Sequence, residues 1–287
     1  VRTTFPQALY LDLLGSEIYN DLLASPQRLD SLIPKGFTDW IILDEVQRVP
    51  DLLNEVHRLI ESKKHKFVLT GSSARKLRRK GVNLLAGRAL TYTMHPLTAK
   101  ELGKDFDLKH SLKFGQLPSV YMEADPKAYL ESYVQTYLRE EVQQEGLTRN
   151  LGAFSRFLEA ASFSQGAVLS VTTIARDCGV DAKTVKEYYQ ILVDTLLGTF
   201  IEPWKRRQER QVIGKAPKFY LFDVGVAGAL TERHLVEAKG EQFGRALEHF
   251  MLMEMLAHRS YRALAHGIHF WRTKTGLEVD FVLGDGE

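Results

Sequence analysis

The chain has 287 residues, of which 44% are hydrophobic and 26% are charged, with a net charge of +2 and one cysteine. This composition predicts a globular protein of two or more domains, and it excludes a disulfide framework and a strongly basic nucleic-acid-binding protein. No apolar run reaches the roughly 18 residues of a membrane span and no signal peptide is present, so we expect a cytoplasmic protein without a membrane partner.

Residues 1 to about 100 alternate between strand-like and helical patterns. The strand-like runs are 8–13, 39–44, 66–70 and 89–95, and the helical patterns are 16–33, 50–64 and 72–80. Strands separated by helices predict a parallel sheet with right-handed crossovers. The fold class of this region is therefore α/β.

Within the strand at 39–44, four apolar residues run directly into two acids, Asp44 and Glu45. A continuous apolar run is typical of a central strand, and α/β sheets bind ligands at the carboxyl ends of their strands. The pattern has the form of a Walker B motif, in which Asp44 would orient Mg²⁺ and Glu45 would polarise an attacking water. The alternative is a pair of solvated acids that cap the next helix.

Small hydroxyl residues, Thr70 and Ser72, follow the next strand, where a polar side chain could sense the γ-phosphate of ATP. The same residues could simply form a strand-to-helix turn with an N-cap. Arg88 could sense phosphate or act as an arginine finger, and the alternative is an ordinary surface arginine. The sequence leaves both pairs of alternatives open.

From 108 to 165 the pattern is helical, and residues 172–180 and 181–188 then read as two short helices joined at Gly179. This is the helix-turn-helix pattern, with Asp181 as the N-cap of the second helix. Two strand-like runs, 196–201 and 218–222, follow as the strands of a wing, with a basic run at 205–210 between them.

As a DNA reader, the second helix would enter the major groove and the basic run would contact the backbone. The DNA-binding candidates are Lys183, Thr184, Lys186, Arg206 and Arg207. The alternative is a rigid packing or protein-contact module.

These motifs together resemble the bacterial and archaeal AAA+ superfamily ATPases that carry a C-terminal domain of unknown function. The resemblance covers nearly the whole chain, through residues 40–50, 67–77, 83–89, 137–157, 174–197, 219–226 and 270–283. It implies a P-loop-NTPase-like parallel sheet domain that uses ATP and Mg²⁺, with Asp44 as the metal ligand. Ring assembly is common in this superfamily, so a homo-oligomer is a further expectation.

The resemblance also implies a glycine-rich phosphate loop just upstream of the strand at 8–13. Since the chain opens on Val1 and ends soon after a strand at 278–283, we expect a longer native protein. A chain without this loop would lack the backbone donors, lysine and hydroxyl that hold phosphate and Mg²⁺, and we would not expect tight ATP binding. It would also have a gap beside the strand at 39–44.

The tail resembles the start of a PD-(D/E)XK nuclease-like core, a small α/β module. Its candidate metal-binding acids are Glu248 on a helix, and Glu278 and Asp280 on one face of a strand, with an acid-x-Lys strand expected after Glu287. The alternative is a helix acid and two sheet-surface acids that hold no metal.

We therefore expect four regions: an ATPase domain at 1–103, a helical segment at 104–166, a winged helix at 167–235 and a nuclease-like tail at 236–287. The leading hypothesis is ATP hydrolysis coupled to binding or regulation of double-stranded DNA. The alternatives are a non-catalytic DNA-binding or scaffold protein, and a metal-dependent nuclease completed beyond Glu287.

Overall fold

The structure is a computed structural model that describes residues 3–71, 87–137, 150–204, 216–232, 239–273 and 275–284. The chain divides into two compact units, Val1–Thr91 with Asp194–Leu196, and Tyr92–Val193 with Leu197–Glu287. Among the sequence-based candidates, Ser72, Arg206 and Arg207 lie outside the described residues, as do the helical pattern at 72–80 and the basic run at 205–210.

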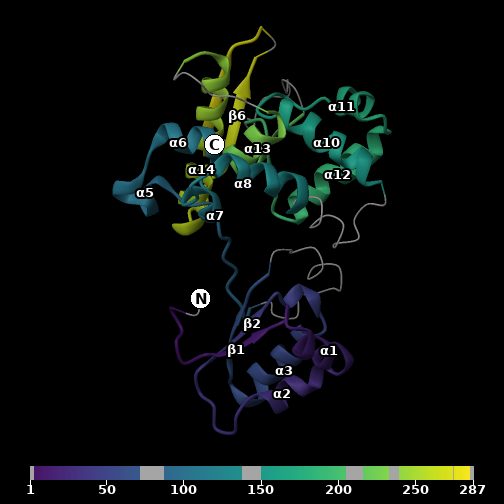
Figure 1. The fold of residues 1–287 in the computed structure, drawn as a ribbon, viewed down its shortest axis with the longest axis vertical. Helices are drawn as coiled ribbons and strands as arrows, with labels where there is room; N and C mark the ends of the chain where they lie inside the picture. The colour runs from purple at the N-terminus through teal and green to yellow at the C-terminus, as the bar shows by residue number, and fades with distance from the viewer. Residues whose placement is uncertain are drawn as a thin grey trace. The chain divides into compact units, whose positions relative to one another are not determined.

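The first unit contains a three-stranded parallel sheet in the order β1-β2-β3, accompanied by short helices (Figure 1). Its elements are β1 (Leu9–Asp12), α1 (Ser16–Ala24), η1 (Pro26–Arg28), α2 (Leu29–Leu32), β2 (Trp40–Asp44), η2 (Val46–Arg48), α3 (Leu52–Lys63) and β3 (Lys66–Leu69). The parallel sheet predicted for the strands at 8–13, 39–44 and 66–70 is thus confirmed.

Strand β2 lies at the centre of this sheet, because it pairs with β1 on one side and with β3 on the other. The expected gap beside this strand is therefore wrong: the helix α3 crossover brings β3 directly against it. Ile41, Ile42 and Leu43 are all fully buried, as an apolar run buried on both faces requires. Ile41 and Leu43 pack with apolar residues of α1, α2 and α3 in one core cluster.

The strand predicted at 89–95 is not formed in the structure, where these residues have no regular secondary structure. Leu90, Tyr92 and Met94 alternate as a strand requires, yet their exposed fractions are 82%, 80% and 86%. A strand exists only where a neighbouring strand completes its backbone hydrogen bonds, and alternation alone does not supply that partner.

The second unit is mostly helical, with two small antiparallel sheets, β4-β5 and β6-β7 (Figure 1). Its elements are α5 (Ala99–Leu102), η3 (Gly103–Asp105), α6 (Leu108–Phe114), α7 (Pro118–Tyr121), α8 (Pro126–Ser132), the π-helical turn η4 (Tyr133–Tyr137), α10 (Leu151–Phe163), α11 (Val171–Cys178), α12 (Ala182–Asp194), β4 (Gly198–Ile201), β5 (Lys218–Leu221), α13 (Val224–Leu230), α14 (Glu241–Tyr261), β6 (Ile268–Arg272) and β7 (Glu278–Leu283). Within the described ranges, every helix is too short or too polar to cross a membrane.

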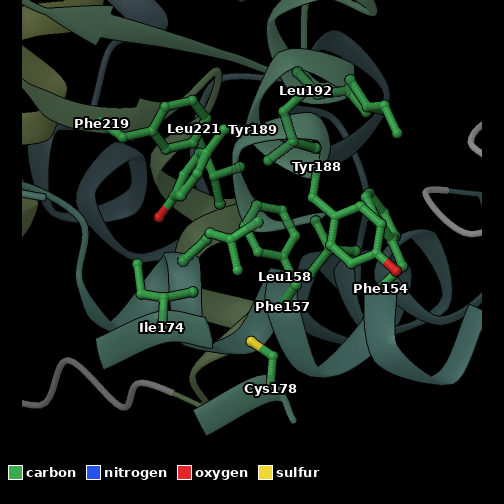
Figure 2. Packing of buried hydrophobic residues seen from close by; sticks show 14 of the residues in the cluster. Phe154, Phe157, Leu158, Ile174, Cys178, Tyr188, Tyr189, Leu192, Phe219 and Leu221 are labelled. Atoms are coloured by element: carbon green, nitrogen blue, oxygen red, sulfur yellow. The ribbon is translucent and has the colours of Figure 1, made fainter. Parts of the chain in front are cut away.

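An aromatic core joins α10, α11, α12 and β5 (Figure 2). Phe157 contacts Tyr189 with ring centroids 4.8 Å apart, and Tyr189 contacts Phe219 at 4.7 Å, both edge to face. Such ring pairs contribute about 0.5–1.5 kcal/mol beyond the burial of their area. Cys178 is also buried in this core, and burial raises the pKa of its thiol.

Strand β5 separates two cores, because its side chains alternate between the two faces of the sheet. Phe219 and Leu221 belong to the aromatic core, whereas Tyr220 packs with α14 and β6 on the other side. The residues predicted as a wing thus form a strand pair in which all four residues of β5 are buried. The C-terminal elements α14 and β6 complete one of the two cores that β5 divides.

The hairpin β6-β7 also bonds to the chain just after β4. Trp204 N–H donates to the Phe270 carbonyl at 2.6 Å, and Phe270 N–H donates to the Glu202 carbonyl at 3.3 Å. The hairpin is therefore attached to the β4-β5 pair through backbone hydrogen bonds as well as side-chain packing.

Candidate functional site

The carboxyl ends of the three parallel strands are held together by backbone hydrogen bonds that continue past the strands. Leu13 N–H donates to the Asp44 carbonyl at 3.2 Å, Thr70 N–H to the Leu43 carbonyl at 3.0 Å, and Val46 N–H to the Thr70 carbonyl at 3.0 Å. These bonds fix the residues that follow β2 and β3 next to each other. Two acids and a hydroxyl side chain therefore meet at one edge of the sheet, the edge where parallel α/β sheets bind ligands.

Asp44 accepts hydrogen bonds from two hydroxyl groups, one from each neighbouring strand. Tyr10 Oη donates to one carboxylate oxygen and Thr70 Oγ1 to the other. Tyr10 lies opposite Ile42 in the register, two residues from Asp44, so both side chains are on the same face of the sheet. Two neutral hydroxyl donors thus help to orient this half-buried carboxylate.

Glu45 follows directly with a left-handed backbone, φ 60° and ψ 41°. This conformation costs a non-glycine residue roughly 1–2 kcal/mol, and residues that adopt it are concentrated at functional sites. The Glu45 carboxylate accepts a hydrogen bond from the side-chain amide of Gln47, a residue only 4% exposed. Both the backbone and the side chain of Glu45 are thus constrained.

A guanidinium group lies at the same edge. Arg48 Nη1 donates to the Leu13 carbonyl at 2.6 Å, and its Cζ lies 4.4 Å from the centre of the Tyr19 ring. The site therefore offers carboxylate and hydroxyl oxygens with a fixed cation nearby. Oxygen donors are the ligands that Mg²⁺ prefers, so Asp44, with Thr70 beside it, fits the magnesium that an ATP site would carry.

The structure places Arg88 elsewhere. Its Nε donates to the carboxylate of Glu61, and this contact lowers the pKa of Glu61 below its ordinary value. Glu61 is in the last turn of α3, which runs back from the carboxyl end of β2 to the start of β3. Arg88 therefore lies toward the amino-terminal ends of the strands, whereas Asp44 lies at their carboxyl ends. Its role toward phosphate stays a prediction.

The DNA-binding candidates on α12 lie at its first turns. Asp181 Oδ1 accepts hydrogen bonds from Lys183 N–H at 2.8 Å and Thr184 N–H at 2.9 Å, so it caps the helix as the sequence predicts. The Thr184 side chain also takes part in this cap, since its hydroxyl donates to Asp181 Oδ2 at 2.7 Å. Lys183 and Lys186 are exposed, and Lys183 lies 4.0 Å from the carboxylate of Glu187.

The three nuclease-like acids converge on a lysine that the sequence analysis treats only as part of a strand. Lys218 has a side chain only 2% exposed, and its Nζ lies 3.2 Å from Glu248 Oε1, 2.6 Å from Glu278 Oε1 and 4.0 Å from Asp280 Oδ1. Tyr220 Oη also donates to Glu248. Burial and the neighbouring carboxylates raise the pKa of Tyr220 far above its ordinary value, so this hydroxyl stays a donor.

These acids therefore already share a cation, the Lys218 ammonium. Among the described residues, no group of three or more histidine, cysteine or acidic side chains has an arrangement that could hold a metal ion. The nuclease alternative therefore remains a prediction from the sequence.

Comparisons with known proteins divide the chain in three. Residues 2–103 match an AAA domain, residues 105–236 match a domain of unknown function (DUF8612), and residues 243–287 match a second domain of unknown function (DUF4143). The AAA match covers every residue of the edge described above and suggests an ATP-binding function of the AAA type.

Among curated proteins, uncharacterized proteins of Mycobacterium bovis and Mycobacterium tuberculosis are each 26% identical over 255 residues, which is 85% of this chain and 56% of theirs. An uncharacterized protein of Haemophilus influenzae is 22% identical over 235 residues, which is 76% of this chain and 57% of its own. The chain thus spans just over half the length of these relatives. No solved structure matches it.

Sequence reasoning missed several residues that the structure brings into these clusters, namely Tyr10, Gln47 and Arg48 in the first and Lys218 and Tyr220 in the second. Tyr10 could have been found from the parallel pairing, since a tyrosine two positions before the end of the adjacent strand can reach Asp44. For Lys218 the signal was a lysine at the start of an otherwise apolar strand, because a lysine buried there requires acidic partners. For Gln47 the sequence offers only its spacing of two from Glu45.

Proposed function

We propose that this protein binds ATP with Mg²⁺ at the carboxyl edge of the β1-β2-β3 sheet and hydrolyses it. The observation that carries the proposal is the pair of acids after a central strand, with Asp44 held between the hydroxyls of Tyr10 and Thr70. The AAA match over residues 2–103 supports the same ligand. Magnesium, when bound, would neutralise phosphate charge during transfer.

In this proposal the protein residues divide the work by position. Asp44, as a Walker B aspartate, orients the metal, and Glu45 accepts a proton from the attacking water. Thr70, which contacts Asp44, would sense the γ-phosphate, and Ser72 is a second candidate for that role.

The test is steady-state ATP hydrolysis by the full-length protein with Glu45→Gln. Because a positioned base contributes about 100-fold or more, hydrolysis should fall by that amount while Mg²⁺-dependent ATP binding is kept. Asp39→Asn is the matched control, since it removes a carboxylate at the other end of the same strand and should leave the rate unchanged. Hydrolysis that survives Glu45→Gln unchanged would contradict the assignment.

A second proposal concerns DNA and rests on the exposed face of α12. Lys183 and Lys186 project from the first turns of a helix that follows a tight turn at Gly179, the geometry with which such helices enter the major groove. We propose that this helix contacts double-stranded DNA and that ATP turnover regulates the contact.

The test reverses the two charges with Lys183→Glu and Lys186→Glu and measures duplex binding across a series of salt concentrations. Binding should weaken and its salt dependence should become shallower, because fewer phosphates are neutralised. The control reverses Lys104 and Lys109, two exposed lysines on other elements, and changes the net charge equally. Equal losses in both double variants would refute a specific contact by α12.

A further inference from the structure

Gln47 is a buried polar residue at the ATP-site edge that the proposed chemistry does not yet use. It lies in η2, two residues after Glu45, and is 4% exposed. Its Nε2 donates to Glu45 Oε2 at 2.5 Å. Burying an amide is unfavourable unless it is hydrogen-bonded, so this contact fixes the Gln47 side chain and the Glu45 carboxylate together.

The other side of the Gln47 amide rests on the backbone of Gly71, just past β3. A Cβ atom added to Gly71 would lie 2.3 Å from Gln47 Oε1 and 3.2 Å from Gln47 Cδ. Only a residue without a side chain allows this approach, although Gly71 has no left-handed backbone that would itself require glycine. The amide is therefore held between the Glu45 carboxylate and the end of the neighbouring strand.

These contacts complete the support of Glu45. Its left-handed backbone is followed by the bond from Val46 N–H to the Thr70 carbonyl, and its carboxylate is reached by the Gln47 amide. We infer that Gln47 is a positioning residue, which orients the Glu45 carboxylate toward the attacking water of ATP hydrolysis. The inference rests on the proposed function and assigns Gln47 no contact with ATP itself.

A misplaced catalytic group slows the chemical step without weakening substrate binding, which gives the inference a specific kinetic signature. Gln47→Met keeps the volume of the side chain but removes its N–H donor. In the full-length protein, kcat for ATP hydrolysis should fall about 10-fold or more, while KM for ATP changes by less than about twofold. Gln27→Met, the same replacement at an exposed glutamine of η1, is the control and should leave both values unchanged.

A double variant tests whether Gln47 acts through Glu45. If it does, adding Gln47→Met to Glu45→Gln should lower the residual rate no further, because the carboxylate that Gln47 orients is already gone. Independent, multiplicative losses would overturn the inference.

Gly71→Ala tests the contact from the opposite side. The added methyl group should displace the Gln47 amide, lower kcat as Gln47→Met does, and lower the midpoint of thermal unfolding. In a Gln47→Ala background the methyl group has room, so Gly71→Ala should cost no further thermal stability. Equal thermal losses in both backgrounds would show that the amide does not rest on Gly71, and would overturn the inference.

These measurements separate the inference from the proposed function. A wild-type protein that does not hydrolyse ATP would refute the function, and the thermal coupling of Gly71 with Gln47 would still report on the contact. Hydrolysis that depends on Glu45 but keeps its kcat in Gln47→Met would support the function and overturn the positioning role.

Discussion

Asp44 and Glu248 are both half-buried carboxylates, and each accepts a hydrogen bond from a tyrosine hydroxyl. Their remaining partners differ. Asp44 is held by a second hydroxyl, that of Thr70, whereas Glu248 shares the ammonium group of Lys218 with Glu278. The second cluster therefore has a cation, the Lys218 ammonium, built into the fold.

The surroundings of an acidic residue indicate whether it serves ligand binding or stability. The acids after the central parallel strand accept hydrogen bonds from hydroxyl and amide groups, and they lie where α/β sheets bind ligands. Acids that surround a buried lysine instead offset the free energy lost when its ammonium group is removed from water. Substitutions in the two clusters should therefore have opposite consequences, for activity in one and for stability in the other.

The largest effect should come from Lys218→Met. Removing the buried ammonium leaves Glu248 without this cation and Glu278 with only the exposed guanidinium of Arg272, 3.7 Å away. Breaking a buried ion pair costs about 3–5 kcal/mol. Because both acids retain some contact with water, we expect a loss in unfolding free energy of about 3 kcal/mol, at the lower end of that range. Urea-induced unfolding measures it.

The control is Lys100→Met, which removes an exposed lysine of α5 and should cost little. Adding Glu248→Gln to Lys218→Met should restore part of the loss, because it removes the carboxylate charge that Lys218 had neutralised. If Lys218→Met were no more harmful than Lys100→Met, the two clusters would not differ in the way described above.

Around Asp44 the prediction is reversed. Tyr10→Phe and Thr70→Val remove hydroxyl donors while keeping the shape of the side chains, so stability should change by only about 1 kcal/mol. Loss of groups that orient a metal ligand typically costs about 10–100-fold in metal affinity or activity, and we expect Mg²⁺-dependent ATP hydrolysis to fall in that range.

ATP hydrolysis and urea unfolding of the same variants make this comparison, with Thr38→Val, at an exposed position before β2, as the control. A stability loss in Tyr10→Phe as large as that in Lys218→Met would mean that Asp44, too, is a structural acid.

The sequence predicts the first cluster far better than the second. The apolar run before Asp44 identifies β2 as a central strand, and parallel pairing then places Thr70 beside it. Both inferences use short-range patterns and the rule that carboxyl ends of parallel strands meet. The partner of Lys218 at Glu278 lies 60 residues later in the chain, and no local pattern indicates such a pairing.

The strand predicted at 89–95 is wrong for a similar reason, because the prediction used only a local pattern. Its alternation of apolar and polar residues satisfies a local rule, but strand formation also needs a partner, which is a property of the whole fold. The αL backbone at Glu45 is equally hidden, because a non-glycine residue rarely adopts it and the surrounding hydrogen bonds impose it.

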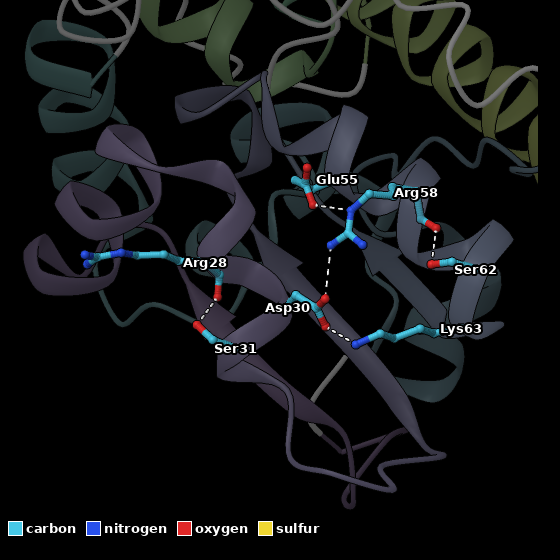
Figure 3. A network of polar contacts seen from close by, with 7 residues as sticks. All are labelled: Arg28, Asp30, Ser31, Glu55, Arg58, Ser62 and Lys63. Atoms are coloured by element: carbon cyan, nitrogen blue, oxygen red, sulfur yellow. Dashed lines mark hydrogen bonds and ion pairs between the residues drawn. The ribbon is translucent and has the colours of Figure 1, made fainter.

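A third group of charges lies on the surface of the first unit, where its ion pairs are exposed to water (Figure 3). Asp30 on α2 accepts from Arg58 Nη2 at 3.1 Å and from Lys63 Nζ at 2.5 Å, both on α3. The hydrogen bond from Lys63, followed by that from Arg58, lowers the pKa of Asp30 below its ordinary value of 3.8.

Asp30→Asn should therefore have the smallest effect, about 0.5–1 kcal/mol of unfolding free energy at neutral pH and low salt, as exposed ion pairs usually give. A carboxyl group with a lowered pKa in the folded state stabilises the fold above its unfolded pKa, and this contribution is lost as the pH falls through the folded value. The difference between wild type and Asp30→Asn should thus be constant above about pH 5, shrink at lower pH, and also shrink in high salt.

Urea unfolding at several pH values measures this difference, with Glu17→Gln as a control at an exposed acid of α1. A difference that persisted at low pH would show that Asp30 stabilises the fold through packing or neutral hydrogen bonds instead of through its charge.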